Sequence, residues 1–286
     1  ADIENITVLK DAASASIYGS QAAAGVILIT TKRAKDGSAG LSYSYTLGID
    51  SPTEMPVYMD AVSYMEAVNE LKYNDLPSSG WYQMYSREHV QNYMANNKQN
   101  PDLYPDTDWN GLIMKKNALR HSHNLKFTAS GSKLKSSVSL GFDDVDGLYV
   151  ANLNWKRYSA RINNGLKIFD WLHLSADLSL KYTDKLSPHS SPALKMRYMP
   201  SIFPAVWSDG RYAPGKDASN IYAALVSGGE NKTKALKTAA KFQLDATPVK
   251  GLKITVLYAP DFSFTHATDF QRQTPYYDYG ATTSTK

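Results

Sequence analysis

A strict alternation of apolar with polar or small residues, sustained over long segments, constrains this chain more than any other feature. Leu41, Tyr43, Tyr45, Leu47 and Ile49 are each separated by one small or polar residue. Successive side chains of a β-strand point to opposite faces, so such a segment predicts a strand with one apolar face. Similar segments begin near residues 125, 138, 158, 172, 242 and 252. Together they predict about seven strands, and an all-β fold class.

The predicted strands are joined alternately by short turns and long insertions. Short turns are expected at 130–133, 168–170 and 248–251, and long insertions at about 50–120, 143–155, 183–235 and after 265. Such long loops are unusual in a compact soluble domain, whereas long loops on one side only are typical of an outer-membrane β-barrel. A soluble β-sandwich, either a carbohydrate-binding module or a surface adhesin, is the alternative. The length of the strands and the one-sided loops count against it.

Two further segments predict local structure. Residues 1–33 contain a strand at Ile6–Leu9, small residues, and an apolar strand at Gly25–Thr31 that we expect to be buried on both faces. Residues 32–40 have the composition of a linker. In the first long insertion, Asp60 is expected to cap a helix that carries an apolar stripe of Ala61, Tyr64, Met65 and Val68.

Composition excludes several classes of protein. The 286 residues include no cysteine, which excludes disulfides, cysteine-based zinc sites and thiol nucleophiles. The formal net charge of +4, with no run of five basic residues, gives no reason to expect a nucleic-acid partner. The longest apolar run, Val26–Ile29, is far shorter than a membrane-spanning helix. Nucleotide-binding, serine-hydrolase and zinc-protease motifs are absent from the sequence, so no enzyme is predicted.

Several motifs resemble the SusC/RagA family of TonB-dependent outer-membrane transporters. They include the stretch 2–12, the stretch 17–23 and the strand 25–32, which are similar to the end of the family's plug domain. Thr107–Asn110, Ser130–Ser132, Arg157–Asn163 and Asp209–Tyr212 resemble the beginning of its barrel. Gln21 and Ala24 depart from the arginine and asparagine that the family often has there.

The resemblance implies a fold and a function. Residues 1–36 would be the C-terminal part of an α/β plug, and residues 37–286 the N-terminal third of a 22-stranded antiparallel transmembrane barrel in the Gram-negative outer membrane. The implied function is TonB-dependent import of oligosaccharides or peptides. The implied partners are a SusD-like surface lipoprotein, TonB with ExbB and ExbD, the substrate and membrane lipid. On this interpretation the chain is a piece of a longer protein.

Loop aromatics are the candidates for substrate contact, because flat rings stack on the apolar faces of sugars. The candidates are Trp81, Tyr82, Tyr85, Trp109, Trp207 and Tyr212. Packing within the loops, or contact with a lid, is the competing interpretation for each of them. For the plug stretch 10–32, packing is favoured over substrate contact.

Metal binding and catalysis have little support in the sequence. His121 and His123 share one strand face, but no third ligand lies nearby. The run 143–147 lacks the spacing of a calcium loop and is interpreted as a solvated loop. Asp177 and Lys181 are expected to line a lumen without doing chemistry. No cofactor is predicted, and calcium in the outer loops stays open.

Overall fold

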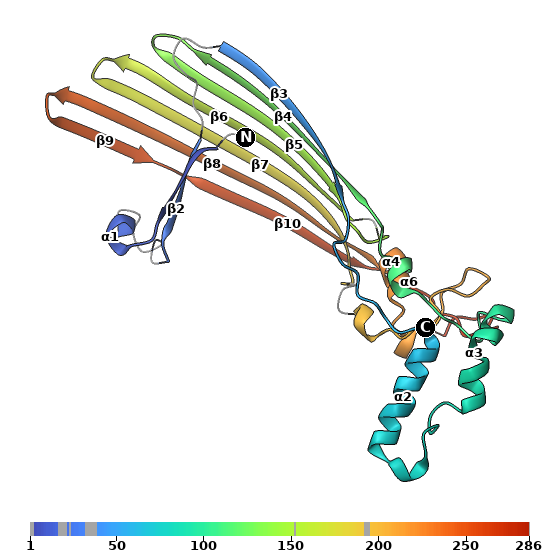
Figure 1. The fold of residues 1–286 in the computed structure, drawn as a ribbon. Coiled ribbons are helices and arrows are strands. Elements are labelled where there is room, and N and C mark those ends of the chain that lie inside the picture. Colours follow the sequence, from blue (N-terminus) through green and yellow to red (C-terminus); the bar gives the residue numbers. More distant parts are fainter. Residues whose placement is uncertain are drawn as a thin grey trace.

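The computed structural model describes residues 3–16, 22, 24–31, 39–151, 153–191 and 195–285. These residues form a two-stranded sheet, a long curved sheet, and a group of helices and loops at one end of that sheet (Figure 1). Most of the motif at 17–23, the proposed domain boundary at 36–37 and most of the predicted linker lie outside the described residues. Strand β3 already begins at Ala39.

The small sheet pairs β1 (Ile3–Leu9) with β2 (Val26–Thr31) in antiparallel register. The short helix α1 (Ala12–Ala15) follows β1, and the Asp11 carboxylate caps it by accepting from the Ser14 N–H. The expectation that β2 is buried on both faces is wrong. Ile27 is 65% exposed and Ile29 58%, because within the described residues β1 and β2 pair only with each other.

The large sheet is antiparallel throughout. Its strands lie in the order of the sequence: β3 (Ala39–Asp50), β4 (Ala118–Ser130), β5 (Leu134–Asp146), β6 (Asn154–Phe169), β7 (Leu172–Pro188) and β8 (Gly229–Val249). Both β9 (Leu252–Tyr258) and β10 (Asp261–Gln271) then pair with β8.

β9 and β10 act as two halves of one edge strand. Their pairing with β8 keeps the same register on both sides of Pro260, which lacks an N–H but whose carbonyl accepts from Ala240 N at 2.9 Å. Proline is tolerated at such an edge position. The described sheet therefore has seven strand positions, which confirms the prediction of about seven.

Several strands are longer than the apolar alternation predicted. β5 continues to Asp146, β7 to Pro188, and β8 begins at Gly229, so the insertions predicted at 143–155 and 183–235 shrink to 147–153 and 189–228. The segment around Tyr158, expected to be short, is the 16-residue strand β6. Backbone pairing continues past the apolar band because cross-strand polar pairs, such as Asp143 opposite Arg157, take over.

Successive hairpins are staggered along the sheet. Leu166 is the last residue of β6 that pairs with β5, and β6 continues beyond it to Phe169. Ala246 is the last residue of β8 that pairs with β7, and β8 continues beyond it to Val249. Each continuation is three residues long and contains a register shift, so each hairpin turn is displaced by two to three residues from the preceding one. This displacement means that the strands are tilted relative to the line that joins their turns.

The apolar face of the large sheet is uncovered. Leu41 is 71% exposed, and Phe262 and Ile49 are similarly bare. The two hydrophobic clusters found among the described residues lie in the loops and helices instead. A β-sandwich would bury these faces against a second sheet, so the sandwich alternative is wrong for this structure.

The long insertions gather at one end of the sheet, and we call this group of loops and helices the cap (Figure 1). It contains α2 (Ala61–Asp75), the 3₁₀ turns at Pro77–Ser79, Met196–Tyr198 and Lys216–Ala218, and the helices α3 (Arg87–Gln99), α4 (Trp109–Ile113) and α6 (Ile221–Ser227). The predicted cap of α2 is confirmed, since the Asp60 carboxylate accepts from Ser63 N at 2.7 Å. Ala61 and Met65 of the predicted stripe are buried.

Candidate functional site

The large sheet has two chemically different faces, and the register puts like residues in rows. On one face, Tyr43 lies opposite Leu125, which lies opposite Leu140, followed by Ala160 and Leu180. We call this the outer face. The residues between them are mostly Ser, Thr, Asn, Lys, Arg and Asp, and they form the inner face. One backbone register therefore makes one surface apolar and the other polar.

An aromatic row crosses the outer face near the cap. Tyr45, His123, Phe142, Tyr158 and Tyr182 occupy matching positions on five neighbouring strands. Their ring centroids follow one another at 4.8, 6.0, 4.9 and 6.2 Å. The next row toward the cap is charged, and Lys156 there pairs with Asp144 at 3.5 Å. The outer face thus changes from apolar through aromatic to charged along the strands.

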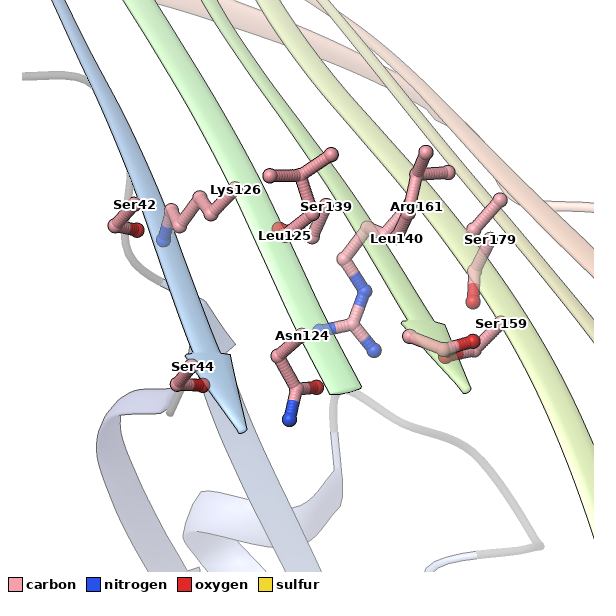
Figure 2. Close-up of a pocket in the computed structure, with 12 residues that line it drawn as sticks. Ser42, Ser44, Asn124, Leu125, Lys126, Ser139, Leu140, Ser159, Arg161 and Ser179 are labelled. Carbon is pink, nitrogen blue, oxygen red and sulfur yellow. Dashed lines mark hydrogen bonds between the residues drawn. The ribbon is translucent and has the colours of Figure 1, made fainter. Parts of the chain in front are cut away.

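A polar hollow of about 340 Å³ lies on the inner face, across β3 to β7. The hollow exists because most of its lining side chains are small. Gly141 lies in its floor, and a Cβ at this position would overlap Ser159 Oγ. Lys126 and Arg161 supply the positive charge, and the guanidinium of Arg161 lies between Asn124 and Ser159 in Figure 2. The other polar lining residues are Ser42, Ser44, Ser139 and Ser179.

Ion pairs link neighbouring strands on the part of the inner face that lies toward the cap. Arg157 contacts Asp143 at 2.8 Å through both Nε and Nη2, and Ser122 Oγ donates to the same carboxylate at 2.8 Å. Arg120 pairs with Asp50 at 3.2 Å. Because Asp143 lies in strand β5 with these partners, the interpretation of 143–147 as a solvated loop is wrong for residues 143–146.

The small β1–β2 sheet lies against this inner face. Ile29 of β2 lines a second hollow together with Arg161, Asp177 and Lys241. Asp177 lies opposite Lys241 in the register, whereas Lys181 lies opposite Lys237. Both residues are therefore on the polar face, as predicted, and Ile29 of β2 lines the same hollow as Asp177.

Two small cores hold the cap together. The first joins α4 and α6 to the segment 196–206 through Trp109, Ile113, Met199 and Ile221. The second joins α2 to α3 through Ala61, Met65, Val90 and Tyr93. Tyr93 donates its hydroxyl to Pro105 O at 2.9 Å, and burial raises its pKa to about 12. The cap is thus a packed unit whose position is set by residues of several insertions.

Three of the predicted aromatics lie on the α2–α3 hairpin. Trp81 is 39% exposed and donates its indole N–H to Glu66 at 3.0 Å. Tyr82 is half-buried under the guanidinium of Arg87. Tyr85 packs against the second core, and burial raises the pKa of its hydroxyl. Trp81 therefore has the most accessible ring of these three.

The other three predicted aromatics lie nearer to the sheet. Trp109 is 3% exposed and donates its indole N–H to Pro200 O at 3.1 Å, so its ring packs the first core. Trp207 donates to Tyr277 O at 2.6 Å and is half-buried. Tyr212 shares a 2.7 Å hydrogen bond with Ser227. The six rings are spread over the cap, and a role of any of them in substrate contact stays a prediction.

The two histidines of β4 make hydrogen bonds with tyrosines. His121 Nδ1 lies 2.9 Å from the Tyr45 hydroxyl, and His123 Nδ1 lies 2.7 Å from the Tyr43 hydroxyl. Among the described residues, no three His, Asp or Glu side chains lie together in a way that could hold a metal ion. Within the described ranges, no helix is both long enough and apolar enough to cross a membrane.

Sequence reasoning missed the hollow on the inner face. The signal for it was present, because Ser42, Ser44, Ser139, Ser159 and Ser179 all occupy polar positions of the alternation. Their alignment across four strands, β3, β5, β6 and β7, depends on register, which the sequence pattern does not specify.

Comparison with known proteins gives a consistent picture. The chain is 33% identical over 184 residues to the TonB-dependent receptor SusC of Bacteroides thetaiotaomicron, which covers 64% of this chain and 16% of that protein. It is 23% identical over 266 residues to the TonB-dependent receptor P26 of Formosa agariphila, which covers 91% of this chain and 25% of that receptor. No family model matches the chain.

Solved structures share the fold. A structure of the RagAB peptide importer in its closed-closed state superimposes with a TM-score of 0.70 at 20% identity, over 93% of this chain and 32% of the other. Its open-open state gives a TM-score of 0.67. This chain therefore spans between about a sixth and a third of the proteins it resembles. In sequence and in fold, the chain is similar to part of these TonB-dependent receptors.

Proposed function

We propose that the chain forms part of a transporter that imports oligosaccharides or peptides across the outer membrane in a TonB-dependent manner. The observation that carries this proposal is the uncovered apolar face of a single, long, staggered sheet. In water such a face would drive aggregation, whereas a lipid bilayer satisfies it. The resemblance to SusC supports the same conclusion.

The stagger of the hairpins supports a barrel wall. A displacement of slightly more than one residue per strand, at ~3.4 Å per residue and ~4.8 Å between strands, corresponds to a tilt of roughly 40°. Transmembrane barrels have strands tilted by about 35–45°. We infer that residues 37–286 form the N-terminal third of a 22-stranded wall. The aromatic row near the cap would lie at the outer membrane interface, and the cap outside it.

The polar inner face suits the lumen of such a barrel. We assign residues 1–36 to the end of the plug domain, because β2 lies beside Arg161 and Asp177 on that face. An outer membrane has no nucleotide source of energy, so movement of the plug would be driven by TonB with ExbB and ExbD. A SusD-like lipoprotein would cover the cap side. We propose no catalytic role and no resident cofactor.

Uptake by living cells tests this function. A strain that lacks the full-length protein should lose growth on its oligosaccharide or peptide substrate, and a TonB-deficient strain should show the same loss. Replacement of Trp207 with alanine tests the loop aromatics, since we expect weaker uptake when a ring that contacts the substrate is removed. Uptake that persists without TonB would contradict the proposal.

A further inference from the structure

A third hollow, polar and of about 360 Å³, lies where β8 and β10 meet the cap. Its lining combines two cations with hydroxyl and amide groups. The residues that matter here are Lys195, Ser219, Gln271, Arg272, Thr274 and Tyr276. None of them belongs to the six predicted aromatics or to the hollow on the inner face.

The fold holds the walls of this hollow in place. Gly229 of β8 pairs with Gln271 of β10, and Arg272 N donates to Gly228 O at 2.9 Å. Gly229 has a φ of +108°, and a Cβ there would overlap the carbonyl of Phe270, so the first position of β8 requires glycine. On the other side, the fully buried Asn220 donates to the carbonyls of Ala205 and Ala213 and anchors the loop that carries Ser219.

The hollow carries positive charge from two side chains. Neither Lys195 nor Arg272 forms an ion pair with any residue that the structure describes, whereas the nearby Asp269 carboxylate is held by His189 Nδ1 at 2.7 Å. Arg272 lies with its guanidinium 5.9 Å from the centre of the Phe270 ring. Two cations in a partly enclosed polar site attract an anionic group.

Neutral hydrogen-bonding groups complete the site. The hydroxyl of Thr274 is buried without a hydrogen-bond partner among the described residues. Such an orphaned group is costly unless a ligand or water satisfies it. Tyr276 is 9% exposed, and burial raises the pKa of its hydroxyl, so it remains a donor at neutral pH.

We propose that this hollow binds a carboxylate group of the transported substrate. The planar guanidinium of Arg272 suits a carboxylate, which accepts two parallel hydrogen bonds from it. Acidic sugars and the C-terminus of a peptide both carry this group, so the shared chemistry is the carboxylate. This inference rests on the proposed transport function and refines its substrate class.

Binding to the full-length protein, purified in detergent, tests the inference. The probes are trigalacturonic acid with its methyl ester, and trialanine with its C-terminal amide, measured by calorimetry. We expect one acid to bind more tightly than its neutral derivative. Arg272→Gln and Lys195→Gln should each weaken binding of that acid by about tenfold and leave the neutral derivative unchanged. Lys250→Gln is the matched control, because Lys250 is exposed in the turn between β8 and β9, at the opposite end of the sheet.

The outcomes separate this inference from the proposed function. Equal affinity for acid and neutral probes, no binding of either acid, or binding unaffected by both substitutions would overturn the carboxylate site. Each variant must reach the outer membrane in the wild-type amount, and tighter binding at low salt supports the charge-based explanation. If the carboxylate site is overturned but uptake still depends on TonB, the proposed transport function is unaffected. If uptake does not depend on TonB, the proposed transport function itself is wrong.

Discussion

A lysine placed on the outer face at Leu125 should strongly destabilise the full-length protein in a membrane. Leu125 lies five residues from Ser130, where β4 ends at its short turn. At ~3.4 Å per residue and a tilt of roughly 40°, this places Leu125 about 13 Å above the turn. An apolar band ~25 Å tall then has its midplane close to Leu125. A lysine at the midplane costs about 2–4 kcal/mol, so Leu125→Lys should lower the free energy of unfolding by about 3 kcal/mol.

The neighbouring residue provides the control. Asn124 lies on the same strand and at nearly the same depth, but its side chain is on the inner face beside the hollow. Asn124→Lys should lower the free energy of unfolding by no more than about 1 kcal/mol, because its side chain is exposed to water and only a screened repulsion from Arg161 opposes it. Urea unfolding of both variants in lipid vesicles measures the difference. Equal effects of the two lysines would refute the assignment of the apolar face to lipid.

Three further predictions concern the cap. Asn69→Ala should destabilise the α2–α3 hairpin by about 2–4 kcal/mol and increase its cleavage by protease, because Asn69 is fully buried and accepts from both Met84 N and Tyr85 N. Trp109→Ala should cost about 3–5 kcal/mol of local stability through the cavity left in the first core, measured by hydrogen exchange at α6. The hydrogen bond from the Ser63 N–H lowers the pKa of the Asp60 carboxyl in the folded protein. The stability that the Asp60 cap contributes is therefore complete above the ordinary carboxyl pKa of about 4, and it is lost as the pH falls through the lowered pKa of the folded state. Hydrogen exchange at the first turn of α2 should therefore rise below about pH 4 in the wild type and not in Asp60→Asn.

Local sequence patterns were enough to predict the positions of the strands and the start of α2. Alternation identified the positions of the sheet because a strand with one apolar face has a side-chain period of two. The capping aspartate located the start of α2 for a similarly local reason. The prediction failed at strand ends such as Asp146 and Pro188, where polar cross-strand pairs extend the ladder without an apolar pattern.

What the sequence alone determined was the chemistry of each residue and the face of the strand on which it lies. The tertiary structure decided which residues meet. Register aligned five aromatic rings from Tyr45 to Tyr182 and gathered serines around Arg161. Packing of distant insertions buried Trp109, and the junction of β8, β10 and the cap placed Lys195 and Arg272 in the lining of one hollow. These juxtapositions join residues far apart in the chain, and no local periodicity carries information about them.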